Sequence, residues 1–228
     1  MRPLTDTTPK PLLSVAGRPL IEHHIMRLRD AGFTELVVNM SYLGQQLADF
    51  LGDGSHWGLT ILISEESSPL ETAGGIVQAL PLLGQAPFLL VNGDIYTDYP
   101  FGPLSHCPLG DAGAHIVLVP NPPHNPDGDF ALRGDRVEAL AKIDPPSEQD
   151  SASTMRALAA TYGGLGVYDP DFFASCPTGK QPLKPLLDAA ITQNKLSGEL
   201  YLGIWEDVGT PERLAALNQR FPSGSASQ

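Results

Sequence analysis

The stretch Phe88-Leu89-Leu90-Val91-Asn92-Gly93-Asp94 decides the fold class of this chain. Four consecutive apolar residues followed by Asn-Gly-Asp predict a short strand that is buried on both faces and ends in polar residues. Such strands are typical of sheets with helices on both sides, where ligands bind outside the carboxyl ends of the strands. The stretch therefore predicts an α/β fold, with Asp94 at the place where such a sheet holds its ligand.

Helix and strand patterns alternate on the N-terminal side of this stretch. Apolar residues have helical spacing at 18–31, 45–51 and 75–83, and short β-forming runs lie at 35–39 and 59–63. This alternating order predicts a doubly wound, mostly parallel, Rossmann-like sheet.

The C-terminal side is predicted to be less regular. Strands are expected at 114–119, 161–168 and 200–205, a hairpin at 130–132 and 137–140, and helices at 183–193 and after Thr210. Thr210-Pro211-Glu212 has a capping side chain, a proline at the first helical position and an acid in the first turn. Residues 141–156 are expected to form an exposed loop and 222–228 a flexible tail, which leaves 1–221 as a single domain.

The composition excludes several classes of protein. The 228 residues include 14 Lys and Arg against 26 Asp and Glu, so the formal net charge is −12. This charge argues against a broad nucleic-acid-binding surface but leaves room for a local site that binds a small anion. No apolar stretch is long enough to cross a bilayer, and neither a signal peptide nor a disulfide framework is indicated. We therefore expect a cytoplasmic protein with no membrane or nucleic-acid partner.

Two carboxylates follow strand-like runs and are candidates for a metal site. Asp94 ends the central stretch, and Asp207 follows the run 200–205. Mg²⁺ in proteins is commonly held by one or two carboxylates together with substrate phosphates, so the two residues could share one ion. The alternative is that each simply caps a loop or helix, because Asp is common in turns after strands.

Two further segments have the chemistry of a phosphate or nucleotide site. Lys10 stands between Pro9 and Pro11, which stiffen the backbone on both sides and could fix its charge toward a phosphate. The segment 69–75 ends in two glycines before a predicted helix, where free backbone N–H groups can bind polar groups. The alternatives are a solvated lysine in a turn and an ordinary joint between loop and helix.

Taken together, these segments resemble the sugar-1-phosphate nucleotidyltransferase family. The matching motifs, which span nearly the whole chain, are Arg2-Pro3-Leu4-Thr5, Thr8-Pro9-Lys10-Pro11, Gly17-Arg18-Pro19-Leu20-Ile21, Leu70-Glu71-Thr72-Ala73-Gly74-Gly75, Val91-Asn92-Gly93-Asp94, Gly128-Asp129-Phe130 and Trp205-Glu206-Asp207-Val208-Gly209-Thr210. Each motif alone is unspecific, but the set in this order is specific. Within the family, the chain most resembles the branch that acts on N-acetylmuramate 1-phosphate in cell-wall (peptidoglycan) recycling.

The resemblance implies the fold of the nucleotide-diphospho-sugar transferases and a Mg²⁺-dependent reaction in which a sugar 1-phosphate attacks the α-phosphorus of UTP, yielding a UDP-sugar and pyrophosphate. Such chemistry depends on positioning and charge neutralisation. The implied catalytic residues are Lys10, which contacts the phosphates, and Asp94, which shares the metal with Asp207. The implied nucleotide-binding residues are Lys10, Glu71, Thr72, Gly74, Gly75, Asn92 and Gly93. The implied sugar-phosphate-binding residues are Gly128, Asp129 and Gly164.

The chain departs from the family at its N-terminus. Family members begin with a strand and a Leu-Ala-Ala-Gly-x-Gly-x-Arg loop that precede the segment starting here at Met1. We therefore expect the domain to be N-terminally incomplete, with one central strand missing from the sheet. If the chain as given is the product, very weak transfer activity or none is expected.

Two other functions remain open at this point. One is a transferase for another nucleotide or sugar, such as a mannose-1-phosphate guanylyltransferase. The other is a catalytically impaired module that binds a nucleotide sugar. Substrate profiling distinguishes the first from UTP use, and binding without turnover would indicate the second.

Overall fold

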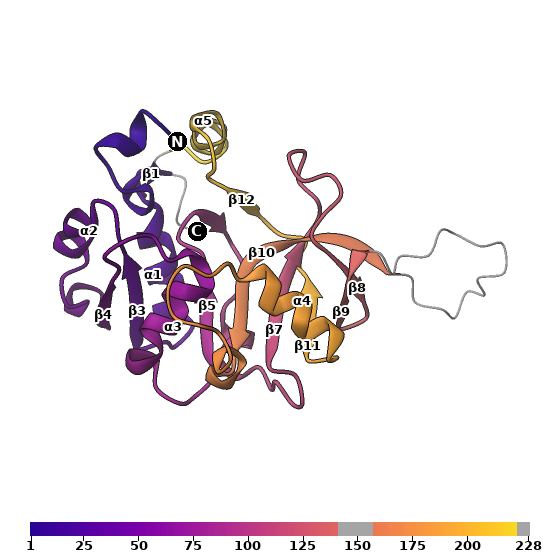
Figure 1. Ribbon diagram of the computed structural model, residues 1–228. Helices are drawn as coiled ribbons and strands as arrows, with labels where there is room; N and C mark the ends of the chain where they lie inside the picture. Colours follow the sequence, from indigo (N-terminus) through magenta and orange to yellow (C-terminus); the bar gives the residue numbers. More distant parts are fainter. Residues whose placement is uncertain (141–156, 223–228) are drawn as a thin grey trace.

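The computed structural model describes residues 1–140 and 157–222 and shows the predicted α/β class (Figure 1). The helices are α1 (Leu20–Asp30), α2 (Gly44–Leu51), α3 (Glu71–Leu83), α4 (Lys184–Thr192) and α5 (Pro211–Arg220). The strands are β1 (Ser14–Val15), β2 (Arg18–Pro19), β3 (Glu35–Met40), β4 (Thr60–Glu65), β5 (Phe88–Val91), β6 (Ile95–Thr97), β7 (Ala114–Val119), β8 (Phe130–Arg133), β9 (Arg136–Glu138), β10 (Leu158–Tyr168), β11 (Leu196–Leu200) and β12 (Trp205–Asp207). Short 3-10 helices are η1 (Leu4–Asp6), η2 (Lys10–Leu12), η3 (Ser55–Trp57), η4 (Gly102–His106) and η6 (Pro170–Phe173). The loop expected at 141–156 and most of the expected tail lie outside the described residues.

The described strands form one larger sheet and three separate pairs. The larger sheet has the order β5-β10-β7-β11-β9-β8. β3 pairs with β4 in parallel, with Glu35 opposite Thr60, whereas β1 with β2 and β6 with β12 pair antiparallel. In Figure 1, the β3–β4 pair and helices α1 and α2 lie to one side of the larger sheet.

The prediction of a mostly parallel sheet is wrong. Among the described strands, the only neighbours that pair in parallel are β3 with β4 and β7 with β11, whereas β10 pairs antiparallel with β5, β7 and β8. Parallel neighbours need a crossover connection, usually a helix. Between β7 and β10, the described part of the chain contains the β8–β9 hairpin rather than a crossover helix. This pairing confirms the hairpin expected there. The chain then enters β10 in the direction opposite to β7.

The core lies on both faces of the larger sheet. β7 is its most buried strand, because Ile116, Val117 and Leu118 are all fully buried. Ile116 and Leu118 pack with residues of α3 and α4, whereas Val117 packs on the other face with aromatic residues that follow β6. None of the described helices is long and apolar enough to cross a membrane.

Two element boundaries differ from the sequence prediction. Helix α3 begins at Glu71 rather than at Gly75, so the predicted glycine-rich loop is the first turn of the helix. The strand expected at 200–205 is in fact the end of β11 and the start of β12, with a connection between them. The Asp98 carboxylate accepts hydrogen bonds from the Ile204 amide at 2.7 Å and from the Tyr201 hydroxyl, and these bonds hold the connection out of strand geometry.

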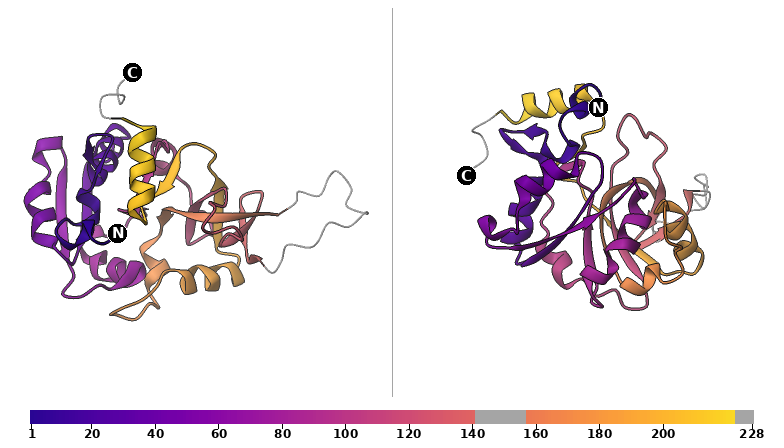
Figure 2. Two further views of the ribbon diagram at one scale, coloured as in Figure 1. Left: turned by 90° about the horizontal axis from the view of Figure 1, so that it is seen from above. Right: turned by 60° about the vertical axis from the view of Figure 1, so that its left-hand side comes forward.

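The two ends of the described chain lie side by side. Helix α5 lies beside the N-terminal segment in both views of Figure 2. The Asn218 side chain on α5 accepts a hydrogen bond from the Ala16 amide and donates one to the Ser14 carbonyl, both at 2.9 Å. As a result, α5 is fixed above the N-terminal third of the molecule.

A cavity of about 430 Å³ separates β3 from β5. Residues of both strands line it, together with apolar side chains of α1 and α3. In the described part of the chain, β3 pairs with β4 and β5 with β10, so the edges that face the cavity have no strand partner. The four residues of β5 are therefore only half-buried, although their apolar run predicts burial on both faces.

His24 of α1 also lines this cavity and is 4% exposed. Its Nε2–H donates to the Ile95 carbonyl at 2.8 Å, because a carbonyl can only accept. Nδ1 is therefore an acceptor, and it is buried without a hydrogen-bond partner. Burial lowers the pKa of His24 to about 4.

This pKa predicts that acid destabilises the protein through His24. The imidazole binds its proton near pH 6.5 in the unfolded chain but near pH 4 in the fold, so the unfolded state gains protons first as pH falls. Stability should therefore fall between pH 6.5 and 4, by about 3 kcal/mol in all. Urea unfolding at pH 7 and pH 4 should show that His24→Gln loses most of this dependence. The exposed His56→Gln is the control, and an unchanged dependence in His24→Gln would contradict the assignment.

Candidate functional site

The two candidate metal carboxylates lie on neighbouring backbone segments. Asp94 follows β5 and precedes β6, and Asp207 is the last residue of β12. β6 and β12 pair antiparallel with Ile95 opposite Asp207, and the Val208 amide donates to the Asp94 carbonyl at 2.8 Å. The fold thus brings together at one place two acids that lie far apart in the sequence.

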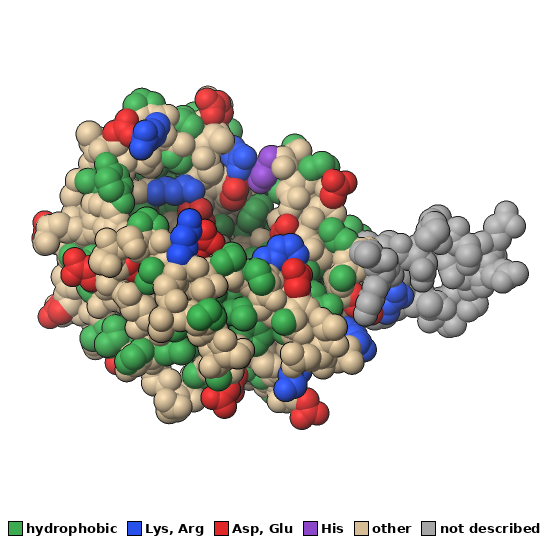
Figure 3. All heavy atoms as spheres, in the orientation of Figure 1, with side chains coloured by type: hydrophobic (Ala, Val, Ile, Leu, Met, Phe, Trp, Pro, Cys, Tyr) green, Lys and Arg blue, Asp and Glu red, His purple; other side chains and the backbone are tan. Residues whose placement is uncertain are grey.

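Each of these carboxylates forms an ion pair with a basic side chain, and a histidine lies near the second one. Lys10 Nζ, at the start of η2, lies 2.8 Å from Asp94 Oδ2. Arg213 Nη1 of α5 contacts Asp207 Oδ1, and His124 Nε2 lies 3.6 Å from the same oxygen. Basic, acidic and histidine side chains gather in a hollow in the upper part of the face in Figure 3.

The donor set fits a hard divalent cation. The described residues contain no group of three or more His, Cys, Asp and Glu side chains that could enclose a metal. Mg²⁺ does not need such a cage, because it keeps several waters and is commonly held by one or two carboxylates plus substrate phosphates. Asp94 and Asp207 are acids of the type that this minimal set needs, and in the described conformation Lys10 and Arg213 pair with them.

Four of the candidate nucleotide-binding residues lie in the first turns of α3, namely Glu71, Thr72, Gly74 and Gly75. Glu71 has a left-handed backbone (φ +58°), and its carboxylate pairs with Lys180 Nζ at 3.1 Å. The backbone amides of Ala73 and Gly74 both donate to the Gln181 carbonyl at 3.1 Å. The sequence predicts that the amides at the start of this helix could bind a ligand. Two of them instead donate hydrogen bonds to another part of the same chain.

Close packing against backbone explains the absence of a side chain at Gly74, and Gly75 lies against the ends of two polar side chains. A Cβ at Gly74 would lie 2.1 Å from the Gly179 carbonyl oxygen, and one at Gly75 would lie 2.6 Å from Glu66 Oε1. Glu71, Thr72 and Gly75 also line the cavity between β3 and β5, as do Asn92 and Gly93 at the end of β5. The structure therefore gathers most of the candidate nucleotide-binding residues around one cavity.

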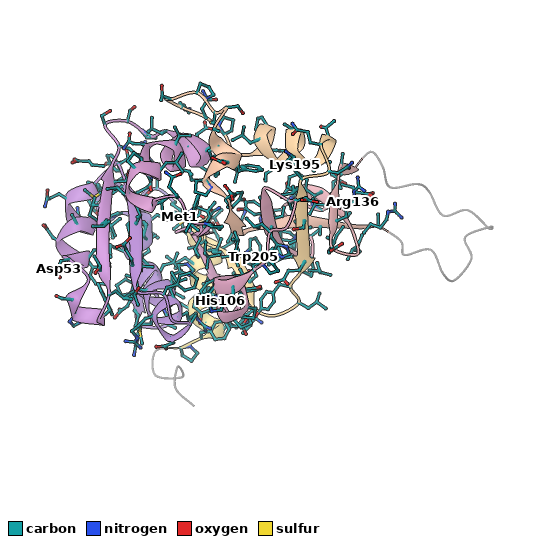
Figure 4. The ribbon with its side chains drawn as sticks, turned by 90° about the horizontal axis from the view of Figure 1, so that it is seen from below. Met1, Asp53, His106, Arg136, Lys195 and Trp205 are labelled. Carbon is teal, nitrogen blue, oxygen red and sulfur yellow. The ribbon has the colours of Figure 1, made fainter. Side chains whose placement is uncertain are left out.

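Lys10 lines a second cavity of about 430 Å³ together with Met1 and Tyr42. Pro11 and Asn39 line both cavities, so the two adjoin at the carboxyl end of β3. Viewed from below, Met1 and Trp205 lie toward the middle of the molecule, whereas Asp53 lies at its outer edge (Figure 4).

Gly164, a candidate sugar-phosphate residue, lies directly against Asn92. Its backbone is left-handed (φ +71°), its carbonyl accepts the Asn92 amide at 2.8 Å, and a Cβ there would lie 2.8 Å from Asn92 Nδ2. Only glycine combines this conformation with so close an approach. Gly164 thus fixes the position of Asn92 at the end of β5.

Gly128 and Asp129 pack against the start of β10. The Asp129 carboxylate accepts the Tyr162 amide at 2.9 Å and the Asn125 side-chain amide at 3.1 Å. Gly128 is left-handed (φ +77°), and a Cβ there would lie 2.8 Å from the Ala160 carbonyl. In the described conformation, Asp129 therefore holds the segment that carries His124 against β10.

Arg213 and His124 are not among the site residues predicted from the sequence. Arg213 lies in the first turn of α5, where the helix dipole disfavours a cation, and this unusual placement was the available signal. His124 lies in the Pro-rich segment between β7 and β8, and nothing in its local sequence pointed to Asp207.

Comparison with known proteins finds a matching family and several relatives of this chain. Residues 1–128 match the protein family described as Nucleotidyl transferase. The chain is 48% identical to an N-acetylmuramate alpha-1-phosphate uridylyltransferase from Neisseria meningitidis over 219 residues, which cover 94% of this chain and 90% of that protein. It is 30% identical to a mannose-1-phosphate guanyltransferase from Hypocrea jecorina over 93% of this chain but only 58% of that longer protein.

The fold is also found among solved structures. A Bacillus anthracis crystal structure assigned as a glucose-1-phosphate thymidylyltransferase aligns with all of this chain and 91% of its own, with a TM-score of 0.77 and 18% identity. At this identity, the likeness establishes the shared fold alone.

Proposed function

Because the chain belongs to the nucleotidyl transferase family, we propose that it transfers the uridylyl group of UTP to a sugar 1-phosphate and releases pyrophosphate. The sugar proposed is N-acetylmuramate 1-phosphate, which would place the reaction in peptidoglycan recycling. The choice of sugar rests on the extent of the match to the Neisseria enzyme. The observation that carries the chemistry is the meeting of Asp94 and Asp207, each beside a basic side chain.

Asp94 and Asp207 would hold Mg²⁺ in this site. When bound, the ion would supply positive charge against the phosphate oxygens and orient them. Lys10 would add a fixed point charge toward the triphosphate, since η2 and its flanking prolines set its backbone. A chain with a net charge of −12 has few other cations to offer a substrate with several phosphates.

The remaining candidate residues would position the two substrates. Glu71, Thr72, Gly74 and Gly75 are proposed to face the base, and Asn92 and Gly93 the nucleotide sugar. Gly128, Asp129 and Gly164 are proposed to lie at the sugar phosphate. Holding both substrates in line accounts for much of the rate in such reactions, because phosphoryl transfer needs mainly positioning and charge stabilisation.

We also propose that an additional strand completes the sheet between β3 and β5. The cavity there is lined by the unpaired edges of both strands and by apolar side chains, and the His24 Nδ1 acceptor beside it has no donor. Met1 lines the adjoining cavity at the carboxyl end of β3. A segment that crosses the cavity between β3 and β5 and then joins Met1 would end at the carboxyl end of β3. Such a segment would therefore run parallel to β3 and β5. In this proposal, 1–221 is a single domain, and the additional strand completes its sheet between β3 and β5.

The cytoplasm is the proposed location of the protein. Both cysteines, Cys107 and Cys176, are free thiols in the structure, which suits a reducing compartment.

Substrate profiling tests the proposed activity. The protein is incubated with Mg²⁺, UTP or GTP, and N-acetylmuramate, glucose or mannose 1-phosphate, and pyrophosphate release is followed. Release with UTP and N-acetylmuramate 1-phosphate is expected to exceed release with the other pairs. Preference for GTP with mannose 1-phosphate would overturn the proposed substrates, and UDP-sugar binding without any release would identify a catalytically impaired binding module.

A further inference from the structure

Arg213 has a position that helix electrostatics alone would not favour. It is the third residue of α5, where the Thr210 hydroxyl accepts its backbone amide at 3.3 Å. The N-terminal turn of a helix carries partial positive charge and stabilises anions rather than cations. The Asp207 carboxylate offsets this penalty by accepting from the guanidinium.

Gly209 keeps the space for this contact. A Cβ at position 209 would lie 2.8 Å from Arg213 Nη1 and 3.2 Å from Asp207 Oδ2. A side chain there would push the guanidinium or the carboxylate aside. The turn between β12 and α5 is therefore shaped so that the two charged groups meet.

Arg220 on the same helix forms an exposed surface ion pair that serves as a comparison for the Arg213–Asp207 pair. It lies in the last turn, where the dipole favours a cation, and pairs with Glu206 at 3.1 Å on the exposed surface. Glu206 is the residue next to Asp207, so the two pairs join the same helix to the same strand. They differ in that only the Arg213 pair involves a proposed metal ligand.

A second element also reaches the Arg213 pair. His124, from the segment between β7 and β8, lies 3.4 Å from Arg213 Nη1 and 3.6 Å from Asp207 Oδ1. Arg213 Nη1 and His124 Nε2 both contact Asp207 Oδ1, on the side of the site formed by α5 and the β7–β8 segment. The Arg213 side chain is about 30% exposed. A ligand that lies between α5 and the β7–β8 segment could therefore reach its guanidinium.

We propose that Arg213 is a phosphate-binding residue that exchanges its partner during binding. Before substrates bind, its guanidinium neutralises Asp207. When Asp207 takes a divalent cation, the guanidinium is released and donates to the phosphate of the sugar 1-phosphate, for which its planar, forked donors are suited. This inference rests on the proposed function, because it assumes that Asp207 binds the metal.

Two binding measurements on the whole chain test the exchange. Mn²⁺ binding to the free protein is followed by electron paramagnetic resonance, and binding of N-acetylmuramate 1-phosphate with Mn²⁺ present is followed by calorimetry. In Arg213→Ala, Mn²⁺ should bind about tenfold tighter, since a competing charge is gone. The sugar phosphate should bind about 10- to 30-fold more weakly, since a charge-assisted pair is lost.

Two further variants make the result specific. Arg213→Lys keeps the charge and should restore the Mn²⁺ affinity, but it should only partly restore sugar-phosphate binding, because lysine lacks the fork. The matched control Arg220→Ala should change neither affinity by more than about twofold. If Arg213→Ala leaves either affinity unchanged while the parent protein binds Mn²⁺, this inference alone is overturned. If the parent protein binds no Mn²⁺, the metal site itself, and with it the proposed function, is overturned.

Discussion

Replacement of Asp94 by Asn is expected to weaken Mn²⁺ binding by about 100-fold or more and, in a protein whose sheet is completed, to lower Mg²⁺-dependent turnover by about 10³-fold. The substitution keeps the shape of the side chain but removes the charge of one of two proposed ligands. Asp207→Asn should have the same effect, because the pairing of β6 with β12 brings the backbone of Asp207 beside that of Asp94. Metal binding to the free protein is the first readout, since it does not depend on the identity of the sugar.

Glu206→Gln is the matched control for this experiment. Glu206 is also an acid of β12, but it pairs with Arg220 on the exposed surface rather than with the groups around Asp94. It should bind Mn²⁺ like the parent protein. Circular dichroism should show that all three variants keep the fold, because each replaced side chain is partly exposed. Near-normal Mn²⁺ affinity in either aspartate variant would remove that residue from the metal site.

Completion of the sheet is expected to have the largest effect on stability. Five or six apolar residues placed before Met1, joined by a short glycine-containing connection, should enter the cavity between β3 and β5. Each buried apolar side chain contributes about 1.5–3 kcal/mol, and ordering each residue costs about 1–2 kcal/mol. New backbone hydrogen bonds to two strand edges add about 1 kcal/mol each. The net gain should be about 5 kcal/mol, a rise in Tm of roughly 10–20 °C for a chain of this size.

The same extension with prolines at alternate positions is the control. Prolines remove the N–H groups that would pair with β3 and β5, so this version should leave the Tm near that of the parent chain. Hydrogen exchange gives the local readout, because amides of β3 and β5 should become protected only with the strand-forming extension. A similar Tm rise with both extensions, or no new protection in β3 and β5, would show that the cavity does not accept a strand.

Local sequence patterns predicted most of the elements. The runs at 88–91 and 114–119 are β5 and β7 with the same ends, and the helix after Thr210 begins at Pro211 with the Thr210 cap. These elements are encoded within a few consecutive residues, through apolar spacing, capping side chains and turn residues. The strand predicted at 200–205 failed because a distant side chain, Asp98, bonds to the connection there.

The candidate site was predicted in its parts but not in its connections. Asp94, Asp207 and Lys10 could be selected from the sequence because their types and flanking residues suit a metal and a phosphate. Nothing local indicated that the Gln181 carbonyl accepts the amides of Ala73 and Gly74, or that His124 meets Asp207, and for Arg213 the only local signal was its place in the first turn of α5. The Gln181 and His124 contacts join segments that are far apart in the sequence, so they depend on how the elements pack. Arg213 differs because it lies close to Asp207 along the chain.

The sequence by itself determined the α/β class, the ends of the central strands and the residue types available for metal and phosphate chemistry. Only the tertiary structure decided that β10 runs antiparallel between β5 and β7, that a cavity separates β3 from β5, and that Asp94 and Asp207 lie together with a basic group beside each. The physical reason is the range of the interactions. Periodicity and capping act within one or two turns of the chain, whereas strand pairing and charge pairing act between segments whose separation is set by the packing of the whole core.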